Sequence, residues 1–311
     1  MSPRLRANLM LLTVAVIWGF AVPVIKFTFN YFDTITFLTY RFFLTSLILI
    51  PLLAITQPRT WSALASLSRR EWLTFIIGGL LGSTLQLGLL FWGLDLTSSL
   101  DGSIINSASP ILVSLAGYYF LKEHITPREK LGQLIAFIGT IFVIIQPVFE
   151  SGWIFSGTLI GNFLVLAGTL AWVGYVLLTK RQLGHLSPLL LTTNMFFLGF
   201  VSMSVIALIF KNPITIYFSL LTSPPAAHLG VLYMVVFSGS LAYWLYQKAQ
   251  KIVEVSEANV FLFLPPVFTA PLAYFWLGEH ITWPAILGSA IIAAGVYVAE
   301  TRKSISPQTP G

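Results

Sequence analysis

The side chains of this chain that could do chemistry are mostly polar or aromatic groups set inside long apolar segments. Within a membrane helix such groups either join neighbouring helices or line a cavity. Ser103, Asn106, Ser107 and Pro110 are three or four residues apart, so they share one face of a helix. We predict that this face lines a substrate pocket, with helix packing as the alternative for each residue. The predicted pocket residues are Trp18, Gln86, Ser103, Asn106, Trp172, Tyr175, Tyr243, Tyr246 and Asn259.

Arg41 is the one residue whose charge lies clearly inside an apolar segment. An arginine at the centre of a membrane helix costs about 2.5–3.5 kcal/mol, so it is a functional candidate. Three interpretations are open: a structural or gating ion pair with Asp101 at the outer mouth, a ligand for a substrate carboxylate, or a side chain that snorkels to the interface. Asp101 and Glu257 also have a simpler explanation, because each lies near a helix start where carboxylates are stabilised.

Catalytic and metal chemistry is poorly supported. The chain has no cysteine and four histidines, and the lack of cysteine excludes disulfides, thiolate metal sites and cysteine nucleophiles. Glu123-His124 and Glu279-His280 fall at helix ends, where a role in the turn is favoured over proton transfer or catalysis. A membrane enzyme would need a nucleophile and a base, or metal ligands, converging at one depth. We therefore predict no enzyme activity, no catalytic residue, no metal and no cofactor.

Composition defines the elements that must position these side chains. Of the 311 residues, 56% are hydrophobic and 9% are charged. A soluble domain carries about 25% charged residues, so soluble enzymes, nucleic-acid-binding domains and disordered proteins are excluded together. A helix needs about 20 apolar residues to cross a bilayer, and the first segment has no signal-peptide cleavage site. We predict ten spans, at 8–27, 34–56, 73–94, 98–120, 128–147, 157–179, 187–210, 228–249, 255–276 and 283–300.

The positions of lysine and arginine predict the orientation of these spans. Of the 17 basic residues, fourteen fall in one set of alternating loops and two, Lys26 and Lys211, in the other. Cytoplasmic loops retain positive charge during insertion. Both termini are therefore expected in the cytoplasm. The net charge of +6 is explained by this asymmetry, and no nucleic-acid partner is predicted.

An internal repeat runs through the chain. The segment Pro110–Thr126 aligns without gaps on Pro266–Thr282, at an offset of 156, and Trp18 and Lys26 match Trp172 and Lys180 at an offset of 154. Each half has five predicted spans, an odd number, so the second half should cross the membrane in the opposite sense. Inverted repeats are a transporter architecture with the site near the midplane between the halves. The fold class predicted is an all-α polytopic membrane protein of two inverted five-helix repeats.

Two glycines recur in register in the last predicted span of each half. They are Gly132 and Gly139 in the first half and Gly288 and Gly295 in the second. Glycines seven residues apart lie on one helix face and permit close helix approach. We predict intramolecular packing, with a homodimer interface as the alternative.

These motifs resemble the EamA family of the drug/metabolite transporter superfamily. The similar residues are Ile17-Trp18-Gly19, Tyr40-Arg41-Phe42, Ser109-Pro110, Lys122–Thr126, Gly132 and Gly139, with a second copy at 266–295. The resemblance implies two EamA repeats, at 5–147 and 155–300, followed by a short cytoplasmic tail at 301–311. It further implies a ten-helix carrier in the bacterial plasma (inner) membrane that moves small metabolites, often amino acids, usually outward.

The expected function is therefore a secondary transporter that works by alternating access. Its predicted partners are the lipid bilayer and a small-molecule substrate, with amino acids or similar zwitterions favoured. Transport of another metabolite or lipid class is the alternative. A channel or a non-transporting scaffold is less well supported, because channel pores use rings of charge or carbonyls around an axis.

Overall fold

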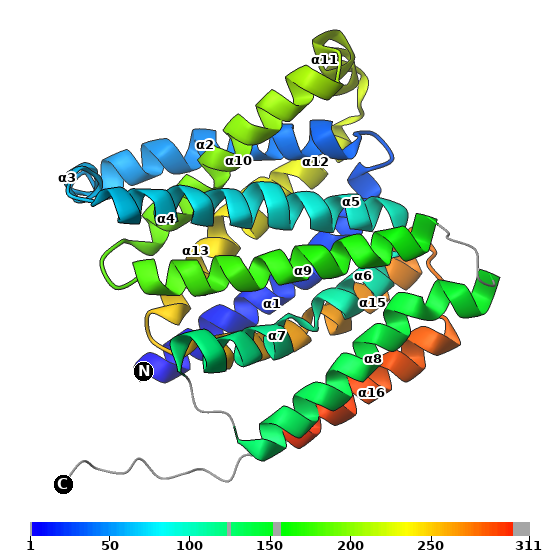
Figure 1. The fold of residues 1–311 in the computed structure, drawn as a ribbon. Helices are drawn as coiled ribbons and strands as arrows, with labels where there is room; N and C mark the ends of the chain where they lie inside the picture. The colour runs from blue at the N-terminus through cyan, green and yellow to red at the C-terminus, as the bar shows by residue number, and fades with distance from the viewer. Residues whose placement is uncertain (1, 123–125, 152–156, 301–311) are drawn as a thin grey trace, which may run out of the picture.

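The computed structural model describes residues 2–122, 126–151 and 157–300, and within these ranges every regular element is helical. The long helices lie side by side and run between two ends of the molecule (Figure 1). The helices α8 and α16 form a pair along one edge, and α11 stands at the opposite edge (Figure 1).

The helices of each half correspond to the apolar segments of the sequence. Those of the first half are α1 (Pro3–Thr28), α2 (Thr34–Thr56), α3 (Thr60–Ala65), α4 (Arg69–Leu80), the π-helix η1 (Leu81–Leu87), α5 (Gly88–Leu96), α6 (Ser99–Asn106), α7 (Ser109–Ala116), the π-helix η2 (Gly117–Leu121) and α8 (Pro127–Ser151). Those of the second half are α9 (Gly157–Gln182), α10 (Pro188–Phe210), α11 (Pro213–Thr222), α12 (Pro225–Tyr233), the π-helix η3 (Met234–Leu241), α13 (Ala242–Gln250), α14 (Val255–Val260), the 3-10 helix η4 (Phe261–Phe263), α15 (Pro265–Leu277) and α16 (Trp283–Glu300).

Eight helical segments of the described ranges are long and apolar enough to cross a membrane. The helices α8 and α16, at the predicted fifth and tenth spans, contain shorter apolar stretches, Lys130–Ile145 and Trp283–Gly295. The count of ten spans therefore stays a prediction. The short helices α3 and α11 were not predicted, because neither is long enough to appear as a membrane span.

The boundaries of the elements repeat along the chain. The helices α9 and α10 begin and end 154 positions after α1 and α2, which is the offset seen in the sequence. The segment Val255–Leu277 follows Ser99–Leu121 at an offset of 156. Left-handed backbone closes both of these segments, at Lys122 (φ 58°) and at Gly278 (φ 68°). The sequence repeat is thus accompanied by a repeat of local structure, including the two turns.

Helix starts show the same correspondence. Asp33 caps α2 by accepting hydrogen bonds from the backbone N–H groups of Ile35 and Thr36. Ser187, at the equivalent position of the second half, caps α10 by accepting from the N–H of Leu190. Both side chains satisfy donors that a helix start leaves free.

Packing between the helices pairs the two halves. In the first half α1 packs against α13 and α15, and in the second α9 packs against α5 and α7. The helices α2 and α10 pack against each other, as do α8 and α16. A Cβ on Gly139 would lie 2.9 Å from the carbonyl oxygen of Gly288, and one on Gly295 would lie 2.5 Å from that of Gly132. The four glycines thus serve the α8–α16 contact within the chain, as the intramolecular interpretation predicts.

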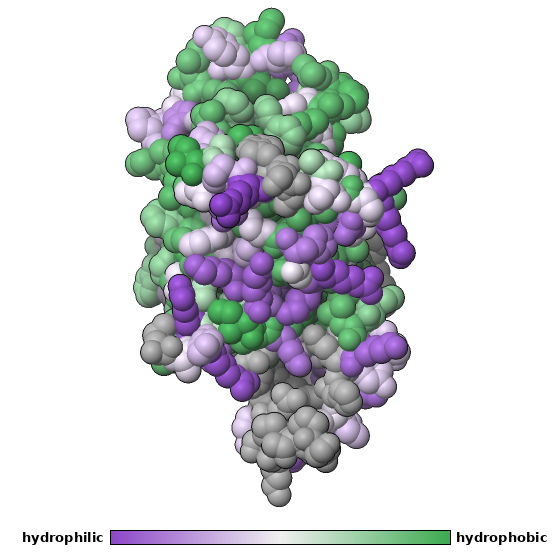
Figure 2. Space-filling model, turned by 90° about the vertical axis from the view of Figure 1, so that its left-hand side faces the viewer, coloured by the Kyte–Doolittle hydropathy of each residue, from purple (hydrophilic) through white to green (hydrophobic). Residues whose placement is uncertain are grey.

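The surface is apolar over much of the bundle and hydrophilic at one end. Figure 2 shows hydrophilic residues gathered across the end at which α1 begins and α9 ends. Exposed basic residues include Arg4 near the start of α1, Arg69 and Arg70 at the start of α4, and Arg181 near the end of α9. Large apolar side chains stay exposed elsewhere, such as Phe275 at 83% and Leu208 at 70%. An exposed apolar surface of this extent suits contact with lipid.

Candidate functional site

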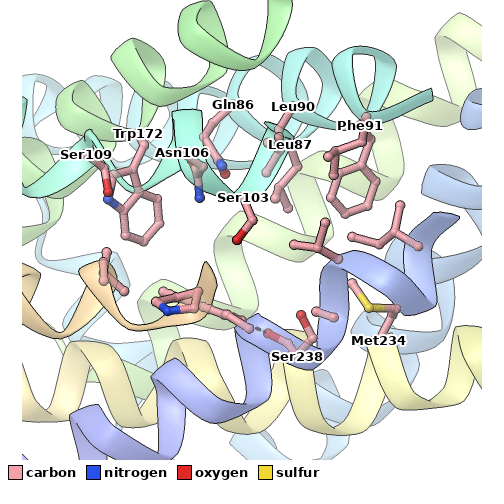
Figure 3. A pocket seen from close by; sticks show the side chains of 18 of the residues that line it. Gln86, Leu87, Leu90, Phe91, Ser103, Asn106, Ser109, Trp172, Met234 and Ser238 are labelled. Atoms are coloured by element: carbon pink, nitrogen blue, oxygen red, sulfur yellow. Dashed lines mark hydrogen bonds between the residues drawn. The ribbon is translucent and has the colours of Figure 1, made fainter. Parts of the chain in front are cut away.

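A cavity of about 80 Å³ lies between the two halves (Figure 3). Its walls come from α1, α2, η1, α5, α6, α7, α9, η3, α13, η4 and α15. The lining residues are Trp18, Ala21, Val22, Ile25, Arg41, Gln86, Leu87, Leu90, Phe91, Leu94, Gly102, Ser103, Asn106, Ser109, Trp172, Met234, Ser238, Tyr243, Leu262 and Pro265. Because a water needs about 10–15 Å³ of such volume, the cavity has room for several waters in this conformation.

Six of the nine residues predicted to bind substrate line this cavity, together with Arg41. The six are Trp18, Gln86, Ser103, Asn106, Trp172 and Tyr243. The other three, Tyr175, Tyr246 and Asn259, are not among its lining residues, but each contacts the lining residue Trp172.

Trp18 and Trp172, which correspond in the repeat, meet in the cavity wall. Their ring centroids are 5.6 Å apart with an angle of 87° between the rings. Tyr243 lies 5.1 Å from the Trp18 ring, and Tyr246 and Tyr175 lie 5.2 and 5.4 Å from the Trp172 ring. Edge-to-face and tilted ring contacts at such distances are favourable. The two halves thus contribute one continuous aromatic wall.

Buried polar side chains support this wall. The amide of Gln247 donates to the Tyr175 hydroxyl at 2.6 Å. The indole N–H groups of Trp18 and Trp172 reach the carbonyl oxygen of Ser238 at 3.2 Å and the side-chain oxygen of Asn259 at 3.5 Å. Asn259 therefore positions an aromatic residue of the wall.

The polar residues of the cavity both pack helices and face the space between them. The hydroxyls of Ser103 and Thr269 are 3.1 Å apart, and Thr169 donates to Asn106 at 3.2 Å. Figure 3 shows the side chains of Gln86, Asn106 and Ser103 pointing into the cavity. The cavity and packing interpretations of these residues are thus compatible.

Arg41 enters the cavity wall from α2 and is 1% exposed. Its guanidinium carbon lies 5.1 Å from the centre of the Phe91 ring and 5.7 Å from that of Phe196. Its Nε and Nη1 have no hydrogen-bond partner among the described residues. A side chain so fully enclosed does not snorkel to the interface.

The predicted ion pair between Arg41 and Asp101 is not found among the contacts of Arg41 in the described chain. The reason is the packing of the two helices that carry them. The helix α2 packs against α10, η3 and α5, whereas α6 packs mainly against α15, α9 and α8. Asp101 is buried in the first turn of α6, where its backbone N–H donates to the N-cap Ser98, as expected for a residue at a helix start.

Comparison with known proteins shows what this architecture is. The model of the EamA-like transporter family matches residues 5–145 and again residues 159–301. The chain belongs to the EamA-like transporter family. The two matched segments correspond to the two halves of the helix repeat.

Three similar proteins illustrate this membership and the fold. The uncharacterized transporter YyaM of Bacillus subtilis (strain 168) is 28% identical over 95% of this chain and 94% of its own. An uncharacterized transporter of Archaeoglobus fulgidus is 27% identical over 96% of this chain and 98% of its own. A solved crystal structure shares the fold, with a TM-score of 0.68 at 17% identity over 94% of this chain and 96% of that one.

Several residues that line the cavity of this EamA-like protein were not predicted from the sequence. Leu87, Met234 and Ser238 lie on the π-helices η1 and η3, where the helical period of 3.6 that orients side chains does not hold. Leu90 and Leu94 follow Gln86 at intervals of four residues, so the sequence places all three on one helix face. They were missed because aliphatic residues in a membrane helix look alike whether they face lipid or a cavity.

Two lysines donate hydrogen bonds to backbone carbonyl groups at helix ends. The ammonium of Lys26 donates to the carbonyl oxygen of Leu94 at 2.8 Å. That of Lys180 donates to the carbonyl oxygens of Gln250 and Val253, the latter at 2.9 Å. Cations at a helix C-terminus interact favourably with its free carbonyl groups. Lys26 and Lys180 thus close the third long helix of their own halves.

The glutamate of the second repeated turn has a structural partner. The carboxylate of Glu279 accepts hydrogen bonds from the N–H groups of Ser99, at 2.9 Å, and Leu100, at 3.2 Å. It therefore caps α6. Its counterpart Glu123 lies outside the described residues, as does the neighbouring His124, and nothing is described of the Glu257 side chain. Among the described residues no group of three metal-binding side chains is found.

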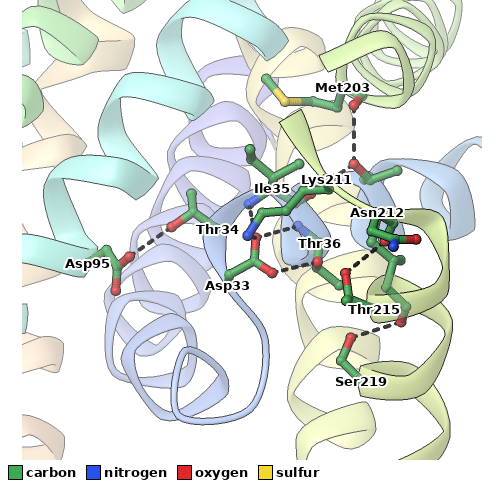
Figure 4. A network of polar contacts seen from close by, with 12 residues as sticks. Asp33, Thr34, Ile35, Thr36, Asp95, Met203, Lys211, Asn212, Thr215 and Ser219 are labelled. Carbon is green, nitrogen blue, oxygen red and sulfur yellow. Dashed lines mark hydrogen bonds and ion pairs between the residues drawn. The ribbon is translucent and has the colours of Figure 1, made fainter. Parts of the chain in front are cut away.

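Asp33 and Lys211 join α2 to the end of α10 outside the cavity (Figure 4). Their Oδ1 and Nζ atoms are 3.3 Å apart. Partial burial of Asp33 by itself would raise the pKa of its carboxyl, but the hydrogen bonds from Thr36 and the charge of Lys211 outweigh burial and lower this pKa below its ordinary value. Asp33 thus holds its negative charge next to a basic partner.

Proposed function

We propose that this protein is a secondary carrier that exports small metabolites, with amino acids or related compounds favoured, across the bacterial plasma membrane by alternating access. The observation that carries the proposal is the cavity lined by both halves, with Trp18 and Trp172 meeting in its wall. Sites between two repeats are typical of secondary transporters. A carrier fits this cavity better than an enzyme, since the lining residues that the structure describes include one charged group and show no nucleophile beside a base.

The proposal includes two inverted five-helix repeats, at 5–147 and 155–300, ten spans in all, and a tail at 301–311. The constant offsets between helix boundaries support the repeat. So does the exchange of contacts between the halves, in which α1 meets α13 and α9 meets α5. An odd number of spans in each half requires the halves to be inverted.

Orientation with both termini in the cytoplasm is part of the proposal. It is supported by the hydrophilic end of Figure 2, because positive charge is retained on the cytoplasmic side. The position of the cavity between the two halves supports alternating access, since movement of one repeat against the other around a site between them is typical of such carriers. A homodimer is not needed for the cavity, because one chain supplies all the lining residues named above.

Counterflow into proteoliposomes tests the transport proposal. Vesicles preloaded with a mixture of amino acids and small metabolites should take up labelled neutral or aromatic amino acids in a saturable way. Trp172→Ala and Tyr243→Ala should abolish uptake, whereas Lys251→Met, an exposed change outside the lining residues, should retain it. Failure of folded protein to exchange any amino acid would redirect the proposal to other metabolites or lipids. Non-saturable flux would indicate a channel.

Labelling of single cysteines tests the inverted topology. The native chain has no cysteine, so Lys122→Cys and Gly278→Cys each introduce one reactive thiol without background. An impermeant thiol reagent should reach Lys122→Cys from the cytoplasmic side and Gly278→Cys from the outside. Labelling of both from the same side would contradict the inverted repeat.

A further inference from the structure

We infer that the cavity selects an organic carboxylate, recognised by its anionic group and an apolar or aromatic body, and that Arg41 is its counter-charge. An ammonium group on the ligand is not required. The inference rests on the proposed transport function and names the substrate class of the same site. Its first basis is the unmet bonding of Arg41: two guanidinium nitrogens of a side chain only 1% exposed have no partner among the described residues.

Burying a cation in this way is expensive unless a partner arrives. The rings of Phe91 and Phe196 face the guanidinium at 5.1 and 5.7 Å. Such cation–π contacts offset part of the loss of hydration, but they leave the N–H donors of Nε and Nη1 without hydrogen-bond acceptors among the described residues. A carboxylate matches these donors in charge and in geometry. The site is thus incomplete without an anion.

The rest of the wall shows which other groups the ligand carries. Arg41 is the only charged residue among the described residues that line the cavity. No carboxylate of these lining residues is available to bind an ammonium group. The aromatic surfaces of Trp18, Trp172 and Tyr243 suit a flat or apolar body. The complementary ligand therefore carries a carboxylate and an apolar body, and the described lining residues do not require an ammonium group.

The repeat shows that this charge is a specific feature of one half. At the offset of 154 that relates α2 to α10, Arg41 corresponds to Met195, which is fully buried. The scaffold thus folds with an apolar residue at the equivalent place. A ligand bound between the halves is held asymmetrically, with its carboxylate toward α2.

Equilibrium binding to the purified full chain tests the inference without any transport. The probes are 3-phenylpropionate, phenylalanine, phenethylamine and 3-phenylpropanamide, which share one ring and differ in charge. Binding in a chloride-free buffer is followed by quenching of tryptophan fluorescence and by thermal shift. We expect 3-phenylpropionate to bind at least as tightly as phenylalanine and about tenfold or more tightly than the amine and the amide, as one added charge-assisted hydrogen bond predicts.

Variants identify the counter-charge. Arg41→Met should weaken binding of 3-phenylpropionate about tenfold or more, and Arg41→Lys should weaken it less. Lys211→Met, which removes a positive charge outside the cavity, should leave it unchanged. Equal binding of all four probes, tightest binding of phenethylamine, or no binding of the anion to folded wild-type protein would overturn the inference. The comparison of the four probes uses the wild-type chain, so it tests the inference even if Arg41→Met does not fold.

The two proposals fail separately. If neutral or cationic metabolites exchange in counterflow and the anion does not bind, transport stands and the substrate class is wrong. If the anion binds through Arg41 but nothing exchanges, the site is correct and the carrier function is overturned.

Discussion

The two halves of the molecule keep the same scaffold and differ where the cavity has its charge. Trp18 and Trp172 meet in the wall, Lys26 and Lys180 close equivalent helices, and Asp33 and Ser187 cap equivalent starts. Arg41, by contrast, corresponds to Met195.

This difference separates two kinds of residue. Roles repeated in both halves satisfy general needs of helices, namely packed rings, closed termini and capped starts. Arg41 satisfies no such need, because its buried Nε and Nη1 lack partners among the described residues. Residues that break the repeat at the cavity are therefore the better candidates for specificity, and those that preserve it are the better candidates for stability.

The largest effects are expected from the paired tryptophans. Trp18→Ala and Trp172→Ala should each destabilise the protein by about 3–5 kcal/mol, since both leave a void in the aromatic wall. Thermal unfolding in detergent measures this loss. Trp18→Phe and Trp172→Phe should lose less. If one alanine variant were neutral, the two residues would not have equivalent roles.

The second-largest effect is expected when Met195 is given the positive charge that Arg41 carries in the first half. Met195 has no exposed surface, so Met195→Arg places a cation inside the bundle at a cost of about 2.5–3.5 kcal/mol. The yield of monodisperse folded protein and its unfolding temperature should both fall. The matched control Met195→Leu should change stability by less than about 1.5 kcal/mol. Tolerance of the arginine would show that the two positions are interchangeable.

The two lysines that close helices should behave alike. Lys26→Met and Lys180→Met each remove charge-assisted hydrogen bonds to backbone carbonyls, so each should lower the free energy of unfolding by about 1–3 kcal/mol. The exposed Lys251→Met serves as the control and should change it by less than about 0.5 kcal/mol. A loss confined to one lysine, measured by thermal unfolding in detergent, would break the correspondence.

The smallest effect concerns the two helix caps. Asp33→Ser gives α2 the cap that α10 has, so at neutral pH the loss should be below about 1 kcal/mol. The pKa of Asp33 is lowered in the fold. Its carboxylate therefore stabilises the protein above the ordinary pKa of about 3.9, and this stabilisation disappears as the pH falls through the lowered value. Unfolding temperatures of the wild type and the variant should converge as the solution is acidified below that ordinary value. A constant difference from neutral to acidic pH would contradict this role.

Much of the architecture could be predicted because membrane spans follow from local composition. The segments predicted at 34–56 and 283–300 coincide with α2 and α16, and Gly139 and Gly295 were expected at a helix contact. The cavity was predictable in part. Trp18, Gln86 and Tyr243 stood out as polar or aromatic groups inside apolar helices, whereas Leu87 and Ser238 depend on π-helices that no simple period reveals.

The sequence by itself determined that the chain is helical, duplicated and suited to a membrane, since these properties depend on local hydropathy and on residue identity at fixed offsets. Only the tertiary structure decided the partners of its buried groups. It placed Arg41 against Phe91 and Phe196 instead of Asp101, and Asn259 outside the cavity lining. The physical reason is that a side chain's partner depends on which helices meet and at what rotation. That geometry is set by packing across the whole bundle.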